Sequence, residues 1–184
     1  PGQTIPRGAP SSDDDVIALI DSYIRKRWRE EAVQPSPPAT DAEWCRRLYL
    51  DLRGRIPTVD EVLYFVEDKS SDKRRRLVDR LLFSEQYSEE FTRNWSTIWT
   101  NLLIGRSGGR NNDRPVSRAC LQKWIRDSLY RNKPYDQFVA ELIAADGTNA
   151  PGHPEFNGAV NFLLDNLQDQ QVPATIEVSQ LFLG

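Results

Sequence analysis

Apolar side chains recur every three or four positions along most of this chain, with polar residues between them. This spacing indicates amphipathic helices, because an α-helix makes one turn in 3.6 residues. No segment shows the sustained alternation of apolar and polar positions, bounded by turn residues, that indicates strands. The pattern therefore predicts an all-α protein, an irregular orthogonal bundle of about eight or nine helices.

Breaks in this pattern predict how the chain is organised. Residues 1–10 mix Pro and Gly without periodicity and are expected to form a disordered leader. Residues 11–33 are predicted to be an N-terminal helix that opens at Ser12 with three aspartates in its first turn, where the helix dipole favours negative charge. Residues 34–39 are rich in proline, which disfavours helix, and form an extended linker. Residues 40–184 are then the main helical domain.

Capping signals and one aromatic face organise this domain. Thr40-Asp-Ala-Glu43 and Thr58-Val-Asp-Glu61 have the form of capping boxes, and Ser84 is expected to cap the longest helix. Large side chains recur in that helix at spacings of 4, 4, 3 and 4, which places them on one face. They are Tyr87, Phe91, Trp95, Ile98 and Leu102. We expect this face to be the centre of the core.

Composition and charge exclude some functions. Of 184 residues, 28% are charged, the formal net charge is −3 and the isoelectric point is near 5.3. An acidic chain argues against nucleic acid as the main partner, and no apolar run approaches the ~18 residues of a membrane span. Residues 46–80 carry ten basic and seven acidic side chains, whereas seven acids and no base follow Lys133. The two halves either complement each other in the fold or form an acidic face that docks a cationic partner.

The cysteines and the chain ends leave questions open. Cys45 and Cys120 could form one disulfide in an oxidising compartment or remain two buried thiols. The chain starts at Pro1 and contains no Met, so we interpret it as a processed or subcloned piece. It ends on three large apolar residues and Gly184, and an exposed apolar end is unfavourable. We therefore expect the natural protein to continue beyond Gly184.

A series of short motifs resembles a known family. It begins with Arg46-Arg-Leu-Tyr-Leu-Asp-Leu52 followed by Ile56-Pro-Thr58. It continues with Leu77-Val-Asp-Arg-Leu-Leu82, Tyr87, Trp95, Asn132-Lys-Pro-Tyr-Asp-Gln-Phe138, Asn157-Gly-Ala-Val-Asn161 and Val172-Pro-Ala-Thr175. In order and spacing, these motifs resemble the planctomycete cytochrome-associated domain of unknown function called PSCyt2, or DUF1549. The likeness covers about residues 40–184.

This resemblance implies a setting but no reaction. Family members are exported bacterial proteins, so it implies a periplasmic or cell-surface location. It also implies a c-type haem segment, Cys-x-x-Cys-His, shortly after the position of Gly184, with no cofactor inside this chain. Neighbouring domains of the same polypeptide and a redox partner are the implied partners. Cys45, Cys120 and the loop 105–116 depart from the family pattern, and the family supplies no catalytic residues.

Three residues are candidates for contact with a cofactor. Arg47 and Asp51 lie four apart on one helix and could form an ion pair that fixes helix packing. Alternatively, Arg46 or Arg47 faces a haem propionate, because a guanidinium fork suits a carboxylate. His153, the single histidine, is either a surface residue or an axial haem or metal ligand.

Other residues suggest interaction rather than chemistry. Lys133, Tyr135 and Asp136 belong to a tight connection between two helices, which explains them structurally unless they bind a partner. Trp95, with two further tryptophans at helical spacing, belongs either to the core or to a sugar-binding groove. No metal site is predicted, because the short acidic runs lack EF-hand spacing. No catalytic group is assigned, since a nucleophile needs a base and His153 is the one histidine.

Two functional hypotheses follow. In the first, the chain is a non-catalytic helical module of an exported c-type cytochrome-like protein. It would scaffold a downstream haem segment and contact neighbouring domains or a redox partner. In the second, it is an extracellular polysaccharide-binding or hydrolytic module, which the aromatic residues and the polar loops at 105–116 and 146–155 suggest. Hydrolysis would need two carboxylates roughly 5–10 Å apart in a cleft.

Overall fold

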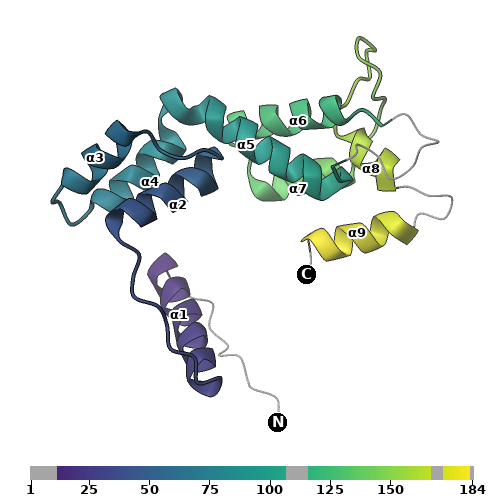
Figure 1. Ribbon diagram of the computed structural model, residues 1–184. Helices are drawn as coiled ribbons and strands as arrows, with labels where there is room; N and C mark the ends of the chain where they lie inside the picture. The colour runs from purple at the N-terminus through teal and green to yellow at the C-terminus, as the bar shows by residue number, and fades with distance from the viewer. Residues whose placement is uncertain (1–11, 107–115, 167–171, 183–184) are drawn as a thin grey trace. The chain divides into compact units, whose positions relative to one another are not determined.

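The computed structural model describes residues 12–106, 116–166 and 172–182. These residues form nine helices and no strand (Figure 1), apart from one isolated bridge between Thr148 and Phe156. The prediction of an all-α protein is confirmed. The chain forms two compact units, Pro1–Ala39 and Thr40–Gly184, and we describe each by itself.

The first unit contains one amphipathic helix, α1 (Asp13–Glu30). It opens at Ser12 as predicted, and the Ser12 hydroxyl caps it by accepting a hydrogen bond from the Asp15 amide at 3.2 Å. No residue of α1 is buried, and Ile17 on its apolar face is 57% exposed. The predicted leader, 1–10, lies outside the described residues.

The second unit contains the other eight helices of the described chain. They are α2 (Asp41–Arg53), α3 (Val59–Glu67), α4 (Lys73–Phe83), α5 (Glu85–Ile104), α6 (Arg118–Tyr130), α7 (Tyr135–Ile143), α8 (Val160–Asn166) and α9 (Val172–Phe182). Two hydrophobic clusters form inside this unit. We call the one among α2, α3 and α4 the first cluster, and the one among α5, α6, α7 and α8 the second cluster.

Local signals place the helices of the first cluster. Both predicted capping boxes are confirmed: the Glu43 and Glu61 carboxylates accept hydrogen bonds from the Thr40 and Thr58 amides at 2.9 and 2.7 Å. Gly54 ends α2 with a φ of +67°, a conformation that favours glycine. The buried members of this cluster are Cys45, Tyr49, Phe65, Leu77 and Leu81.

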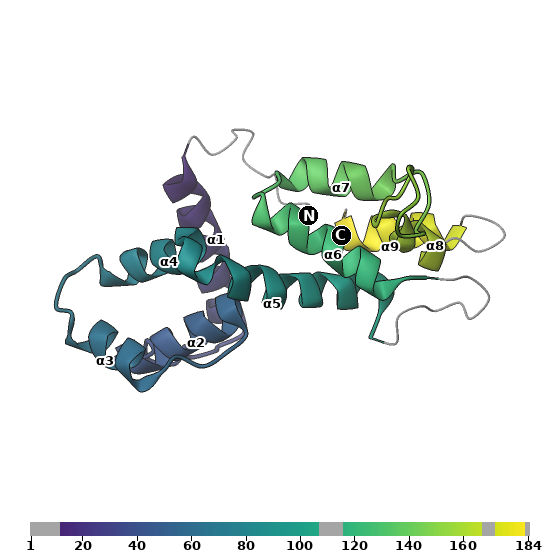
Figure 2. The ribbon, with the colours of Figure 1, turned by 90° about the horizontal axis from the view of Figure 1, so that it is seen from above.

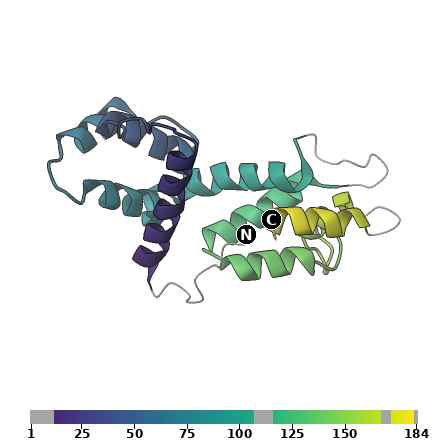
Figure 3. The same ribbon diagram turned by 90° about the horizontal axis from the view of Figure 1, so that it is seen from below.

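The second cluster is larger and lies around α6. Figures 2 and 3 show α5 running beside α6, with α7, α8 and α9 nearby. Its buried members are Leu103, Ile104, Leu121, Ile125, Phe138, Leu142, Ala159 and Phe162. Trp99 and Trp124 pack at its edge, where their ring centroids lie 5.4 and 5.1 Å from that of Phe138.

The aromatic face of α5 is not the centre of the core, so that expectation is wrong. The buried side chains of α5 are Thr92, Ser96, Thr100, Leu103 and Ile104, whereas Ile98 and Leu102 are 37% and 50% exposed. The three small side chains satisfy their hydroxyls on their own helix, as Thr100 does with the Ser96 carbonyl at 2.6 Å. Small residues with satisfied polar groups are cheap to bury, and they face inward here in place of the rings.

Two local predictions are confirmed only in part. Ser84 is the N-cap residue of α5 but makes no capping hydrogen bond with its side chain. The helix predicted over 157–168 begins only at Val160. The Asn157 side chain accepts a hydrogen bond from the Ala159 amide at 3.0 Å and holds a turn before it.

The sequence led us to expect an exposed apolar end, but the end of the described chain is partly covered. Leu181 and Phe182 are half-buried against the second cluster, and the Phe182 ring lies edge-on to Phe162 with centroids 6.4 Å apart. Leu183 lies outside the described residues.

Candidate functional site

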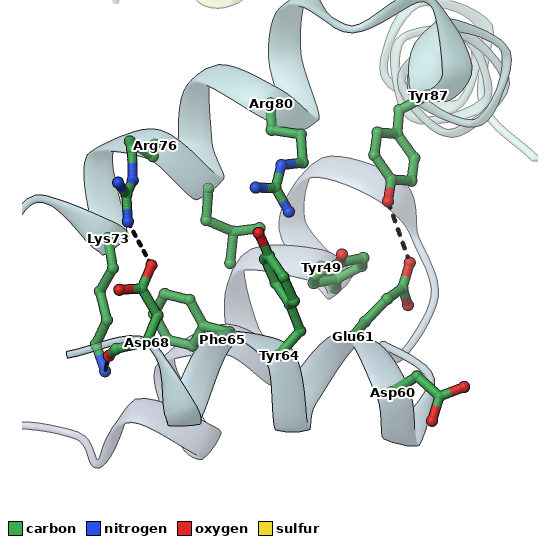
Figure 4. Close-up of a pocket in the computed structure, with 11 residues that line it drawn as sticks. Tyr49, Asp60, Glu61, Tyr64, Phe65, Asp68, Lys73, Arg76, Arg80 and Tyr87 are labelled. Carbon is green, nitrogen blue, oxygen red and sulfur yellow. Dashed lines mark hydrogen bonds and ion pairs between the residues drawn. The ribbon is translucent and has the colours of Figure 1, made fainter. Parts of the chain in front are cut away.

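A cavity of about 270 Å³ opens between α3 and α4, beside the first cluster. Tyr49, Phe65 and Leu77, all at least nine-tenths buried, supply apolar surface to it. Charged and phenolic side chains from α3, α4 and the start of α5 complete its lining (Figure 4). The volume lies just below the range of ligand pockets, which begins at roughly 300 Å³, so the cavity suits a small ligand.

On the α3 side, Glu61 is held by Arg55. Arg55 Nη1 and Nη2 donate to the two oxygens of the Glu61 carboxylate, each at 2.9 Å. The Tyr87 hydroxyl donates to the same carboxylate at 3.4 Å, and the Thr58 amide does so at 2.7 Å. Chiefly because of Arg55, the pKa of Glu61 falls to about 2. Glu61 is therefore ionised at neutral pH, and both of its oxygens have partners.

Arg55 also ties this wall to α5. Its Nε donates to Glu90 at 2.9 Å, and its guanidinium carbon lies 5.2 Å from the centroid of the Tyr49 ring. Burial, and next the neighbouring Tyr87 hydroxyl, raise the pKa of Tyr49 above its ordinary value. The Tyr49 phenol therefore stays protonated and neutral at physiological pH.

Arg53, next to this wall, is 2% exposed. Its guanidinium lies 4.6 Å from the centroid of the Tyr87 ring, and its Nη1 donates to the Tyr87 carbonyl. Burial lowers the pKa of Arg53. Arg53 does not line the cavity, so its contacts fix the start of α5 and, through it, the position of Tyr87.

On the α4 side, two basic residues are neutralised by nearby carboxylates. Lys73 forms an ion pair with Asp41 at 2.6 Å, and Arg76 forms one with Asp68. The hydrogen bond from the Lys73 ammonium is the main cause of the lowered pKa of Asp41. Hydrogen bonds from Ser70, followed by the charge of Arg76, lower the pKa of Asp68 to about 2.

Arg80 differs from these two residues. Its guanidinium carbon lies 5.1 Å from the centroid of the Tyr64 ring, and among the described residues it forms no ion pair. Figure 4 shows Arg80 reaching from α4 toward Tyr64. Asp60, the remaining charged residue of the lining, is exposed, and its carboxylate points away from the other side chains in the same view.

This arrangement suits binding better than proton transfer. A general acid or base works best with a pKa near the operating pH, whereas Glu61 and Asp68 have pKa values of about 2. Arg80 can bind an anion without first losing a carboxylate partner. The apolar surface of Tyr49, Phe65 and Leu77 can receive the body of the same ligand.

Residues 19–181 match the PSCyt2 family, described as "Protein of unknown function (DUF1549)". This chain belongs to the PSCyt2 family. The match begins inside α1, earlier than residue 40, where the likeness was expected to start. No curated protein and no solved structure matches the chain.

Several motifs on which the PSCyt2 likeness was recognised surround the pocket. Tyr49, Leu77, Arg80 and Tyr87 all lie in such segments and line the cavity. Another motif, at 157–161, has a structural role instead. The buried Asn161 side chain accepts hydrogen bonds from the Ser117 amide at 2.6 Å and the Asn149 side chain at 3.0 Å, joining the start of α6 and the 146–157 loop to α8.

The candidates for cofactor contact lie outside the pocket. Arg46 and Arg47 are exposed on α2, and the structure contains no ion pair between Arg47 and Asp51. His153 is exposed in the 146–157 loop, where its Nδ1 accepts a hydrogen bond from the Glu155 amide at 3.2 Å. Arg46 and Arg47 are neighbours on α2, His153 belongs to a different part of the chain, and none of the three lines the cavity.

The interaction candidates gather partly around the second cluster. Lys133 pairs with Glu141, and its ammonium lies 4.8 Å from the centroid of the Trp124 ring. The centroids of the Tyr135 and Trp99 rings lie 6.3 Å apart. Asp136 is exposed in the first turn of α7. Trp95 is half-buried on α5 and does not line the cavity.

The described parts of the chain contain two free thiols, and they contain no metal-binding cluster and no membrane-spanning helix. Cys45 and Cys120 are free thiols, the first buried in the first cluster and the second on α6. Across residues 12–106, 116–166 and 172–182, no three His, Cys, Asp or Glu side chains converge to hold a metal ion. Within the same ranges, no helix has the length and apolar character that crossing a membrane requires.

The pocket itself was not predicted from the sequence. Tyr64 and Arg80 were not singled out, and Glu61 was recognised for its capping role alone. A signal was present in the basic residues of 46–80, which exceed the acids there by three. The sequence does not show which of those bases have partners, because Lys73 finds its carboxylate 32 positions away, at Asp41.

Proposed function

We propose that this PSCyt2 chain is a non-catalytic binding module and that the cavity between α3 and α4 is its recognition site. One observation carries the proposal. Two carboxylates of the lining, Glu61 and Asp68, already form ion pairs and have pKa values of about 2. Arg80, in contrast, has no carboxylate partner among the described residues. Such a site is prepared to bind a charged group and poorly prepared to move protons.

Small probe molecules test this proposal. Anionic, neutral and cationic aromatic fragments are titrated into the 184-residue chain, and the NMR signals of its backbone and tyrosine rings are followed. We expect at least one charge class to shift the signals of Tyr64 and Phe65 saturably. If none of the three classes moves these signals at millimolar concentration, the cavity is not a recognition site and the proposal is wrong.

The proposal has a second part, which concerns setting. We place the module in an exported c-type cytochrome-like protein, where it scaffolds a downstream haem segment and contacts a neighbouring domain or redox partner. The family likeness supports this part. Arg46 and Arg47, exposed on α2 and outside any ion pair among the described residues, are the residues suited to meet a haem propionate.

An extended chain tests the scaffold role. The chain is expressed together with the sequence that follows it, under conditions of c-type haem attachment, and bound haem is measured by absorbance. We expect Leu77→Asp, which disrupts the first cluster, to reduce haem incorporation well below that of the parent and of the exposed control Leu63→Asp. Equal incorporation in all three chains would show that the module does not scaffold the haem segment.

The second candidate function is recognition of an extracellular polysaccharide. The exposed ring of Tyr64, 64% accessible at the pocket, supports it, because sugars stack on accessible aromatic rings. A glycan-array screen of the chain and of Tyr64→Ala tests this role. Binding that is lost in the variant supports it, and an array without any binding contradicts it.

A further inference from the structure

The pocket has a charge balance that favours one kind of ligand. The lining contains three carboxylates and three cations, and most of these charges have a partner nearby. Arg55 neutralises Glu61, Asp41 neutralises Lys73, and Asp68 pairs with Arg76. With Asp60 pointing away, Arg80 is the one charge in the described lining that faces the cavity without a counter-ion.

We infer that the cavity between α3 and α4 binds a single carboxylate carried on a planar apolar group. This inference rests on the proposed binding function and names the ligand class for the same site. Arg80 binds the carboxylate, and the apolar body lies against the surface that Tyr49, Phe65 and Leu77 provide. The guanidinium suits this role because its planar fork can donate two parallel hydrogen bonds to a carboxylate.

Tyr64 positions the Arg80 side chain for this role. The guanidinium carbon lies over the ring, 5.1 Å from its centroid, a cation–π contact that supports the side chain and does not use up its N–H donors. A guanidinium supported in this way loses less conformational freedom on binding than a fully mobile one. The exposed Tyr64 ring also offers a planar surface at the mouth of the cavity.

Other ligand classes fit the same lining less well. A cation would have to bind a carboxylate, but both Glu61 oxygens already accept hydrogen bonds. Asp68 is paired with Arg76, and Asp60 points away from the other side chains of the lining. A dianionic phosphate would call for more than one uncompensated cation, whereas Lys73 and Arg76 already face Asp41 and Asp68. The volume of about 270 Å³ suits one ring with its substituent rather than a folded partner.

Matched aromatic probes test the inference. Benzoate, benzamide and benzylamine share one ring and differ in charge, so their binding to the 184-residue chain isolates the carboxylate. We expect benzoate to shift the NMR signals of Tyr64, Phe65 and the Arg80 Nε–H, and to bind about tenfold or more tightly than benzamide, as a charge-assisted hydrogen bond implies. Acetate, which lacks the ring, should bind more weakly than benzoate.

Variants on one helix identify the residue responsible. Arg80→Gln should reduce benzoate affinity about tenfold or more while leaving benzamide unchanged. Arg80→Lys, which keeps the charge without the fork, should recover part of the loss. Arg75→Gln is the matched control, because Arg75 makes the same charge change on α4, has an 85% exposed side chain and does not line the cavity. Circular dichroism checks that each variant is folded.

Each outcome distinguishes the ligand class from the binding function. If benzamide or benzylamine binds at Tyr64 as tightly as benzoate, the carboxylate inference is wrong and the proposed binding function stands. If no probe binds at Tyr64, both are wrong. If Arg75→Gln weakens benzoate binding as much as Arg80→Gln does, the effect is one of general charge and the role of Arg80 is refuted.

Two peptides distinguish the possible sources of such a carboxylate. Gly-Gly-Phe with a free carboxyl terminus and the same peptide with a terminal amide present one ring with and without the charge. Tighter binding of the free peptide than of benzoate points to a polypeptide end as the ligand. Binding of benzoate without binding of either peptide points to a small aromatic acid. Preference for the amidated peptide contradicts the inference.

Discussion

The two hydrophobic clusters of the second unit differ in the polar groups that lie beside them: small and buried at the second, long and half-buried at the first. Around the second cluster, buried hydroxyls and amides find partners nearby, as Thr100 does on its own helix and Asn166 does with the Phe162 carbonyl at 2.9 Å. Around the first cluster, long charged side chains meet across helices, as Arg55 does with Glu61 and Glu90. Long side chains that meet at the edge of a small core leave space between them, and the pocket lies there.

The largest expected effect compares the centres of the two clusters. Phe162 is fully buried, so Phe162→Ala should lower the free energy of unfolding by about 3–5 kcal/mol. Phe65→Ala should cost less, because Phe65 borders the cavity and water can enter the space that it leaves. Urea unfolding measures both, with Phe83→Ala, 76% exposed, as the control. An equal or greater loss at Phe65 would contradict the comparison.

The next effect tests how closely the helices of the second cluster approach. A Cβ added at Gly158 would lie 2.5 Å from the Cys120 carbonyl oxygen and 2.9 Å from the Trp124 Cβ. Gly158→Ala should therefore lower the free energy of unfolding by roughly 1–3 kcal/mol. Thermal unfolding followed by circular dichroism measures this loss. A variant as stable as the parent would show that α6 and α8 separate easily.

The charged edge of the first cluster should respond to pH. Because the pKa of Glu61 is lowered from 4.5 to about 2, ionised Glu61 stabilises the fold above pH 4.5, and this stabilisation is lost as the pH falls through 2. Glu61→Gln should cost about 1–2 kcal/mol at pH 7, and the difference from the parent should shrink toward pH 2. Urea unfolding across this range measures it.

Two features make this pH comparison specific. Asp68 titrates in the same window in both proteins, so its effect cancels in the difference between parent and variant. Glu67→Gln, at an exposed position of the same helix, is the control and should leave the pH profile unchanged. A parent–variant difference that is constant from pH 7 to pH 2 would contradict the role assigned to Glu61.

The smallest effect tests which face of α5 is buried. Leu102 is 50% exposed and Leu103 is 1% exposed, although the two are adjacent. Leu102→Gln should change the free energy of unfolding by no more than about 0.5 kcal/mol, whereas Leu103→Gln buries an amide in the second cluster and should cost several-fold more. Urea unfolding compares them. Equal losses of unfolding free energy in the two variants would contradict the assignment of the Leu103 face as the buried face of α5.

Local signals predicted the helices well. Ser12, Thr40, Thr58 and Ser117 cap helices through their own side chains, and these contacts span three residues. Such interactions depend on neighbouring positions and can be recognised in a sequence. The all-α class follows from the same periodicity.

The core face and the pocket could not be predicted in this way, because both depend on distant partners. Rings at helical spacing predicted the wrong face of α5, since the close partner of that helix accommodates Ser96 and Thr100 instead. Arg80 looks like any other base of α4 in the sequence. It is distinguished only when Arg76 is seen to pair with Asp68 and Lys73 with Asp41.

Helix α5 belongs to both clusters, and this has a consequence for cooperativity. Tyr87 near its start packs on the first cluster, whereas Leu103 and Ile104 at its end lie inside the second. A helix of 20 residues is about 30 Å long and cannot melt at one end without weakening its other end. Residues 40–184 should therefore unfold in one calorimetric transition, and a ligand that occupies the pocket should raise the melting temperature of the whole unit.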